Sequence, residues 1–202
     1  GYFGFAGSTG GASARNSIKN VKVYIDKVPL LQTSITPNAP CPDITTGIAT
    51  VDLTSFNTQL SATPGSYNFS YYVLGSATPI ANPTNYQYNG NADISVLITD
   101  PTNTLCDNPD AVIHLVPGTI PKNDAILIAC KNNGQGIFNL TTANVTTITT
   151  ATKKYYPTLA NLLAGTNEIT NPAAYSSAGG DVYVKITSQN CSAVAKITLN
   201  FY

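Results

Sequence analysis

The residues of this 202-residue chain with the clearest chemistry are its four cysteines, because paired thiols form disulfide bonds. They are Cys41, Cys106, Cys130 and Cys191. No Cys-x-x-Cys pair, the spacing typical of zinc sites, occurs among them. We therefore expect disulfides, and with them an oxidising, extracellular location at a cell surface. Buried free thiols are the alternative interpretation.

The cysteines form two pairs at matching places in an internal repeat. Pairing within each copy, Cys41 with Cys106 and Cys130 with Cys191, would let each repeat fold as a unit. Closed loops of about 65 and about 60 residues would each contribute roughly 4 kcal/mol in the chain-entropy model. Crossed pairing, Cys41 with Cys130 and Cys106 with Cys191, ranks second because it would join one repeat to the other.

Groups for acid–base or nucleophilic catalysis are sparse. The single histidine, His114, lies in an apolar strand with no nucleophile motif beside it, so we expect a solvent-facing strand residue. Glu168 is the only glutamate, and Asp93 and Asp181 recur at equivalent strand starts, which indicates structure rather than the carboxylate pair of a glycosidase. The sequence has no nucleophile elbow, metalloprotease motif or phosphate-binding loop. We therefore expect that the chain is not an enzyme.

Calcium is the cofactor that the sequence leaves open. Asp43 and Asp52 flank a loop of the first copy that could coordinate a hard cation. The corresponding loop of the second copy, residues 131–135, carries a lysine and no carboxylate. A site lost in one of two copies cannot organise both, so we expect no metal site and no cofactor, with a structural calcium ion as the less favoured alternative.

Two tyrosine pairs, Tyr71-Tyr72 and Tyr155-Tyr156, could form a stacking platform for a sugar. Adjacent strand residues face opposite sides of a sheet, so we expect one ring of each pair in the core and the other exposed. Packing in the core and against a neighbouring strand is the favoured interpretation for both pairs.

A unit of 80 to 90 residues occurs twice in tandem. Its offset is 89 residues at the first cysteine and falls to 85 at the last. Tandem units of this size are typical of modules in an array rather than of the halves of an enzyme. Matching positions include Cys41, Gly47, Ile48, Tyr86 and Cys106 in the first copy, and Cys130, Gly136, Ile137, Tyr175 and Cys191 in the second.

Short strands separated by turn residues dominate both copies, which predicts an all-β chain of antiparallel sandwiches. In the first copy we expect strands near residues 31–35, 48–53, 67–74, 86–88, 94–99 and 111–116. In the second we expect strands near residues 125–129, 137–140, 152–156, 182–187 and 194–201. Residues 158–165 predict one or two helical turns that end at a glycine.

We divide the chain into three parts: residues 1–26 as the end of a preceding β-domain, repeat one over 27–118, and repeat two over 119–202. Ten basic and ten acidic residues give no electrostatic footprint for nucleic acid. No window of 18 apolar residues is present, so we expect no membrane insertion. The chain starts in what reads as the middle of a domain, and we expect a piece of a longer protein.

The repeat resembles the tandem Ig-like modules of very large cell-surface proteins of Bacteroidota. The resemblance covers about residues 29–202 and is carried by the opening cysteine, the Tyr-Tyr strand, the stretch 158–175 and the closing segment 182–191. Those proteins are exported through the type IX secretion system, and many are gliding-motility adhesins. The resemblance implies Ig-like sandwiches and contact with the type IX machinery during export. Repeat one lacks the helical insert and is the more distant copy.

Residues 3–23 resemble the closing strands of an L-type, legume-lectin-like domain. In that family the Gly-Gly loop borders the sugar site, which implies a carbohydrate-binding role for Gly10, Gly11 and Ser13. The metal-binding Asp/Asn strand of the family is missing from this chain. The partners implied are surface glycans, bound through a lectin domain upstream.

These observations and resemblances predict a non-catalytic stalk or adhesion segment of a large secreted bacterial surface adhesin with a role in gliding motility. Two alternatives remain. The repeats could be accessory domains of a secreted hydrolase whose catalytic domain lies outside this chain. They could also form a subunit of a surface filament, with strand exchange between subunits.

Overall fold

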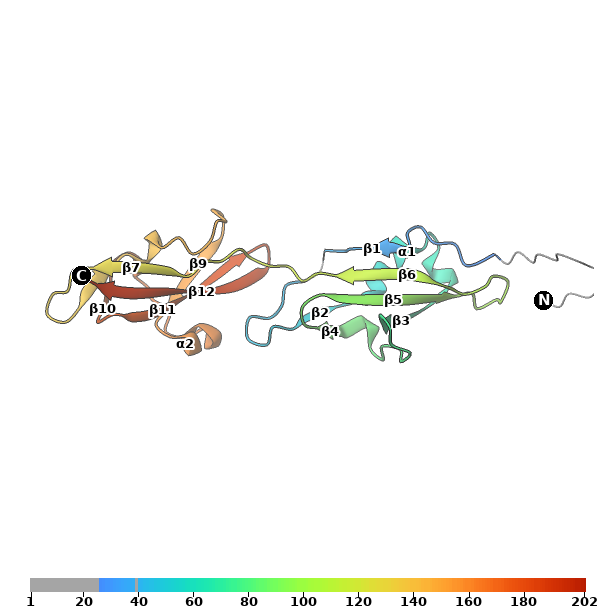
Figure 1. Ribbon diagram of the computed structural model, residues 1–202, viewed down its shortest axis with the longest axis horizontal. Coiled ribbons are helices and arrows are strands. Elements are labelled where there is room, and N and C mark those ends of the chain that lie inside the picture. The colour runs from blue at the N-terminus through green and yellow to red at the C-terminus, as the bar shows by residue number, and fades with distance from the viewer. Residues whose placement is uncertain (1–25, 39) are drawn as a thin grey trace, which may run out of the picture.

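The computed structural model describes residues 26–38 and 40–202, which form two sandwich-like bodies placed end to end (Figure 1). Each body contains one four-stranded and one two-stranded sheet. The prediction of an all-β chain is confirmed. The predicted lectin-like segment, with Gly10, Gly11 and Ser13, lies outside the described residues.

Repeat one is built from short strands joined by turns and 3₁₀ helices. One sheet has the order β1-β6-β5-β3, and β2 pairs with β4 in the other. Its strands are β1 (Ser34–Ile35), β2 (Ala49–Val51), β3 (Asn68–Val73), β4 (Tyr86–Tyr88), β5 (Ala92–Thr99) and β6 (Asn108–Leu115). Its helices are η1 (Leu53–Phe56), α1 (Asn57–Leu60), η2 (Pro64–Ser66) and η3 (Pro83–Asn85).

Repeat two has the same plan with longer central strands. One sheet has the order β7-β12-β11-β9, and β8 pairs with β10 in the other. Its strands are β7 (Ala125–Ala129), β8 (Gly136–Phe138), β9 (Thr152–Tyr156), β10 (Tyr175–Ser177), β11 (Gly180–Ser188) and β12 (Cys191–Phe201). Its helices are η4 (Leu140–Thr142), α2 (Leu159–Ala164) and η5 (Pro172–Ala174).

The edge strand of each larger sheet runs parallel to its neighbour, which corrects the expectation of purely antiparallel sheets. Ile35 of β1 lies opposite Ile113 of β6, and Leu127 of β7 lies opposite Leu199 of β12, both in parallel register. A chain that leaves such an edge strand crosses to the other sheet instead of turning back as a hairpin. The loops that follow β1 and β7 therefore lie at the same end of their repeats as the C-terminal ends of β6 and β12, respectively.

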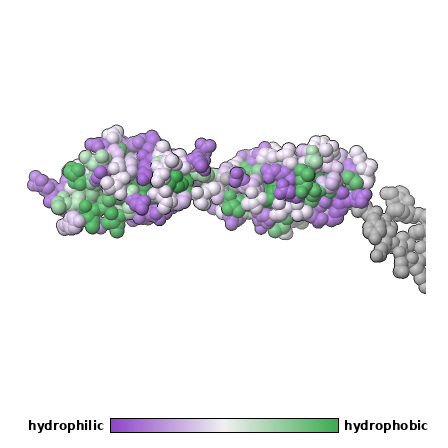
Figure 2. Space-filling model, turned by 90° about the horizontal axis from the view of Figure 1, so that it is seen from above, coloured by the Kyte–Doolittle hydropathy of each residue, from purple (hydrophilic) through white to green (hydrophobic). Residues whose placement is uncertain are grey.

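Each repeat has its own hydrophobic core between its two sheets. Every second residue of the central strands is buried, because successive side chains of a strand point to opposite faces. The buried residues of these strands include Ile94, Val96 and Ile98 on β5, and Val182, Val184 and Ile186 on β11. Figure 2 shows the resulting separation, with two bodies joined by a narrow waist.

Strand pairing corrects the alignment of the two repeats around the first cysteine. Tyr86 and Tyr175 occupy the same position, yet Tyr86 pairs with Val51 and Tyr175 pairs with Phe138. Ala49, not Gly47, is therefore the structural equivalent of Gly136. The loop before β2 is longer than the loop before β8, and the matching Gly-Ile dipeptides are out of register.

Helix α2 is the predicted insert of repeat two. The Thr158 side chain accepts a hydrogen bond from Asn161 N at its start, and Gly165 ends it in the left-handed region at φ 66°. The helix contacts β9 and β11. Leu162 of the helix and Tyr156 of β9 are both buried although neither belongs to the inner core.

Candidate functional site

Cys41 lies in the loop that connects β1 to β2, at the end of repeat one that faces repeat two (Figure 1). A turn anchored by Asp43 holds this loop: Asp43 Oδ1 accepts hydrogen bonds from Thr45 N and Thr46 N, both at 2.9 Å. The backbone N–H groups of Thr46 and Thr45 favour the charged carboxylate and hold the pKa of Asp43 below its usual value. The loop thus presents Cys41 from a hydrogen-bonded turn.

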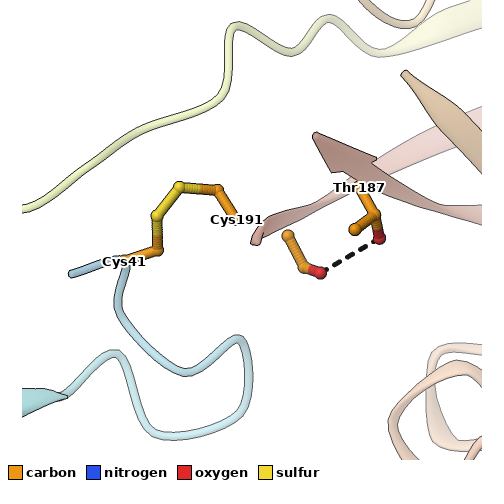
Figure 3. The surroundings of a disulfide bond; sticks show 4 residues. Cys41, Thr187 and Cys191 are labelled. Carbon is orange, nitrogen blue, oxygen red and sulfur yellow. Dashed lines mark hydrogen bonds between the residues drawn. A yellow bond between two sulfur atoms is a disulfide. The ribbon is translucent and has the colours of Figure 1, made fainter. Parts of the chain in front are cut away.

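Cys191 is the first residue of β12 and follows a tight hairpin turn. The turn residues Gln189 and Asn190 have φ values of 48° and 68°, which suits the primed turns that join antiparallel strands. Thr187 and Ser192 flank the turn on the two strands, and their hydroxyl oxygens lie 3.1 Å apart (Figure 3). The hairpin therefore holds Cys191 at the tip of repeat two that faces repeat one.

A disulfide bond joins Cys41 to Cys191 across the junction between the repeats (Figure 3). Their Cα atoms lie 5.3 Å apart, well within the range of protein disulfides, although 150 residues separate them in sequence. Cys106 and Cys130 are free thiols. The predicted pairs Cys41–Cys106 and Cys130–Cys191 are therefore wrong, and so is the crossed alternative.

The parallel edge strands explain why pairing within a repeat fails. Cys106 precedes β6, whereas Cys41 follows the edge strand that runs beside β6 in the same direction. At about 3.3 Å per residue, the eight residues of β6 place the two cysteines at least ~25 Å apart. A disulfide requires Cα atoms within about 7 Å. Cys130 and Cys191 lie at opposite ends of β12 for the same reason.

The junction has few other contacts that could hold the repeats together. Gly118 N donates a hydrogen bond to Pro40 O at 3.4 Å beside the junction, but both residues belong to repeat one. Beside the disulfide the surface is open, with a hollow of about 890 Å³ whose lining includes Val116, Thr119 and Asn190. The two cores do not merge. The disulfide is therefore the strongest single connection between the repeats besides the polypeptide itself.

The two carboxylates considered for calcium are engaged in the local structure of repeat one. Asp43 closes its turn, and the Asp52 side chain caps η1 by accepting a hydrogen bond from Thr54 N at 2.9 Å. Residues 26–38 and 40–202 contain no group of three histidine, cysteine, aspartate or glutamate side chains that could hold a metal ion. Both carboxylates are therefore already used as hydrogen-bond acceptors within repeat one.

His114 and Asp93 form a cross-strand pair on the exposed face of repeat one. They are direct neighbours in the register of β5 and β6, and His114 Nδ1 lies 2.6 Å from Asp93 Oδ1. Their side chains are 40% and 48% exposed. At the equivalent place in repeat two, Asp181 Oδ1 accepts a hydrogen bond from Thr198 Oγ1 at 2.8 Å. The recurrence of this pairing indicates a structural position, as expected from the sequence.

The tyrosine pairs show the predicted alternation of a buried and a more exposed ring in repeat one only, and even there the second ring is half-buried. In repeat one Tyr71 is buried and Tyr72 is half-buried. Burial raises the pKa of Tyr71 to about 12, although its hydroxyl donates a hydrogen bond to Asn57 Oδ1 at 2.5 Å. In repeat two both Tyr155 and Tyr156 are buried, because α2 covers the outer face of β9. Exposed tyrosine platforms are therefore not formed by these pairs.

Residues 126–202 match the family model described as the Flavobacterium inter-domain disulphide bond domain. No curated protein matches the chain. The family description agrees with the observed bond, which joins two bodies instead of closing one. The match and the bond together indicate an extracellular protein of a Bacteroidota type.

Among the residues that the structure describes, no helix has both the length and the apolar character needed to span a bilayer.

Proposed function

We propose that this chain is a non-catalytic stalk segment of a large secreted adhesin on the bacterial cell surface, built from Ig-like modules. The observation that supports this proposal is the Cys41–Cys191 bond, which ties one repeat to the next. A bond between domains restrains their relative movement, and that restraint is useful in a spacer that must project a binding domain. A catalytic role would give no particular reason for such a restraint between the two repeats.

The bond also changes the path of a pulling force through the chain. A force applied between Gly1 and Tyr202 would pass from Cys41 through the two sulfur atoms to Cys191. The 150 residues of separation between these cysteines would be bypassed. At about 3.4 Å per extended residue, roughly 500 Å of chain could not be pulled out while the bond is intact. The protected loop is the chain between Cys41 and Cys191. It contains the core residues of repeat two from Ile120 to Ile186.

Single-molecule stretching of the full chain between its ends tests this role. We expect the oxidised protein to release only the residues outside the protected loop, and reduction to add roughly 500 Å of extensible contour length. The double variant Cys41→Ser/Cys191→Ser should show the longer contour length without reductant. Cys106→Ser should behave like the oxidised wild type. Equal contour lengths before and after reduction would contradict the proposal.

Adhesion itself is assigned to a lectin-like domain upstream, with surface glycans as its ligands. The resemblance of the repeats also supports export by the type IX secretion machinery and a role in gliding motility. No cofactor is needed for such a role. Glycan arrays probed with a protein that includes the proposed upstream domain and with residues 27–202 alone would test the division of labour. Sugar binding by residues 27–202 alone would contradict it.

A further inference from the structure

The two free cysteines lie in the corresponding segments of their repeats to the two bonded cysteines, although not at identical positions. Cys130 follows the edge strand β7 in the connection to β8, as Cys41 follows β1 in the connection to β2. Cys106 lies two residues before β6, and Cys191 is the first residue of β12, so both follow the turn that leads into the last strand of their repeat. Each repeat thus carries one opening-loop cysteine and one hairpin cysteine. The observed bond joins the opening loop of one repeat to the hairpin of the next.

The free cysteines lie at the two outer ends of the pair of repeats. Figure 1 shows the end of β7 beside the C-terminus, and the start of β6 at the opposite extreme of the described chain. Cys130 directly follows Ala129, which pairs with Phe201 near the end of β12. Cys106 N donates to Asp26 O at 2.9 Å, next to the first described residues. Each outer end of the two repeats therefore carries one free cysteine of the kind that forms the bond between the repeats.

Cys130 is exposed and lies next to a hydrogen-bonded turn. The turn after it is closed by two backbone hydrogen bonds between Asn132 and Gln135, of 2.7 and 3.0 Å. The ring of Phe201 packs beside Gly136, and Lys131 Nζ lies 5.1 Å from the centre of that ring. This turn follows Cys130 as the Asp43 turn follows Cys41, so a hydrogen-bonded turn adjoins both cysteines.

We propose that Cys130 forms a disulfide with the hairpin cysteine of a further repeat of this type, and that Cys106 forms one with the opening-loop cysteine of another. This inference rests on the proposed stalk function and specifies its partner. Each bond forms when two thiols lose two protons and two electrons to a small-molecule or protein disulfide, which is reduced to two thiols by exchange. The contact is head-to-tail, so it extends an array in one direction.

The proposal requires that an opening-loop cysteine pairs with a hairpin cysteine and not with another of its own kind, and this can be tested with the full chain. Cys106→Ser leaves only Cys130 free, and Cys130→Ser leaves only Cys106 free. One variant is labelled with ¹⁵N, the two are mixed in equal amounts and oxidised with glutathione disulfide, and the covalent dimers are weighed by mass spectrometry. Random pairing gives one half mixed dimers; we expect at least fivefold more mixed dimers than both like pairs together. A mixed fraction of one half or less would overturn the proposal.

Pairing within one molecule provides the second test, because it does not depend on protein concentration. His114 and Thr198 face the equivalent residues Asp93 and Asp181, so four residues further on Tyr202 corresponds to Gly118. A second copy of residues 119–202 attached directly after Tyr202 therefore reproduces the natural spacing between repeats. We expect peptide mapping under non-reducing conditions to find Cys130 bonded to Cys191 of the attached copy.

The Cys41–Cys191 bond of the same molecule is the internal control for oxidation and folding. A reduced Cys130, or Cys130 bonded elsewhere, while Cys41–Cys191 is intact would overturn the proposal. The proposed stalk function would survive that result, because the stretching experiment depends only on the existing bond. Conversely, loss of the protected contour length with Cys130 correctly paired would contradict the stalk function alone.

Discussion

Asp52 in repeat one and Asn139 in repeat two occupy the same capping position and make the same hydrogen bonds. Asp52 Oδ1 accepts from the backbone N and the hydroxyl of Thr54, at 2.9 and 2.6 Å. Asn139 Oδ1 accepts from the same two groups of Thr141, at 3.1 and 2.6 Å. An amide oxygen therefore does in one repeat what a carboxylate oxygen does in the other, and the cap does not need the charge.

Replacing Asp52 separates a capping role from a metal-binding role. We expect Asp52→Asn to change the free energy of unfolding by less than about 0.5 kcal/mol, and Asp52→Ala to cost about 1 kcal/mol through loss of the cap. Urea unfolding measures both. The melting temperature of the wild type should be the same in calcium chloride and in EDTA. A calcium-dependent rise that Asp52→Asn abolishes would show that Asp52 is a metal ligand.

Removing the bond between the repeats should loosen the junction. In Cys41→Ser/Cys191→Ser we expect a larger radius of gyration by small-angle X-ray scattering, because the two hydrophobic cores do not merge across the junction. Unfolding should become easier by up to about 5 kcal/mol, the chain-entropy value for a loop of 150 residues.

The matched control for the junction is Cys106→Ser/Cys130→Ser, which removes two cysteines and keeps the bond. Its radius of gyration and stability should equal those of the wild type at a protein concentration too low for intermolecular pairing. If both double variants gave the same scattering curve as the wild type, the bond would not restrain the repeats.

The Phe201 ring leaves no room for a side chain at Gly136. A Cβ atom there would lie 2.6 Å from Phe201 Cε1 and 3.3 Å from the Ala129 Cβ atom. We expect Gly136→Ala to cost about 1–3 kcal/mol, as is typical of overpacking. Gly65→Ala is the control, since a Cβ at Gly65 would meet nothing within 4 Å, and it should stay within about 0.5 kcal/mol. Equal effects of the two substitutions would show that the Phe201 contact is unimportant.

Asp100 should make repeat one sensitive to acid. Its two carboxylate oxygens accept hydrogen bonds from the backbone and hydroxyl groups of Thr102 and Thr104 and from Leu105 N. These hydrogen bonds lower the pKa of Asp100 far below its ordinary value of 3.8. The largest effect comes from the Thr104 hydroxyl, and the next largest come from the hydroxyl and the backbone N–H of Thr102. The ionised Asp100 carboxylate therefore stabilises the folded state fully above pH 3.8, the pKa of the unfolded chain. This stabilisation is lost as the pH falls toward the lower pKa of Asp100 in the folded state.

The comparison with Asp100→Asn isolates this effect from other carboxylates. The variant has one acceptor oxygen instead of two and no titratable group, so it should be less stable than the wild type at neutral pH. We expect the difference in unfolding free energy to be constant above about pH 5 and to shrink below pH 3.8. Urea unfolding at several pH values measures it, and a difference that does not change with pH would contradict the assignment.

The strands and the insert of repeat two could be predicted because their signals are local. Alternation in β5 and β11 reflects which side chains face the core, and Gly165 ends α2 at φ 66° as the sequence predicts. The burial of Tyr156 could not be predicted from its strand, because it depends on where a helix several residues later folds back. The two-residue error in aligning Gly47 with Gly136 also became visible only through pairing with β4 and β10.

The sequence by itself determined that the chain is all-β, that it repeats, and that its cysteines lie at recurring positions. Only the tertiary structure decided which cysteines meet. Residue spacing does not reveal the direction of an edge strand, and the parallel pairing of β1 with β6 places Cys41 at the opposite end of repeat one from Cys106. That arrangement brings Cys41 to Cys191 and makes the bond a link between repeats.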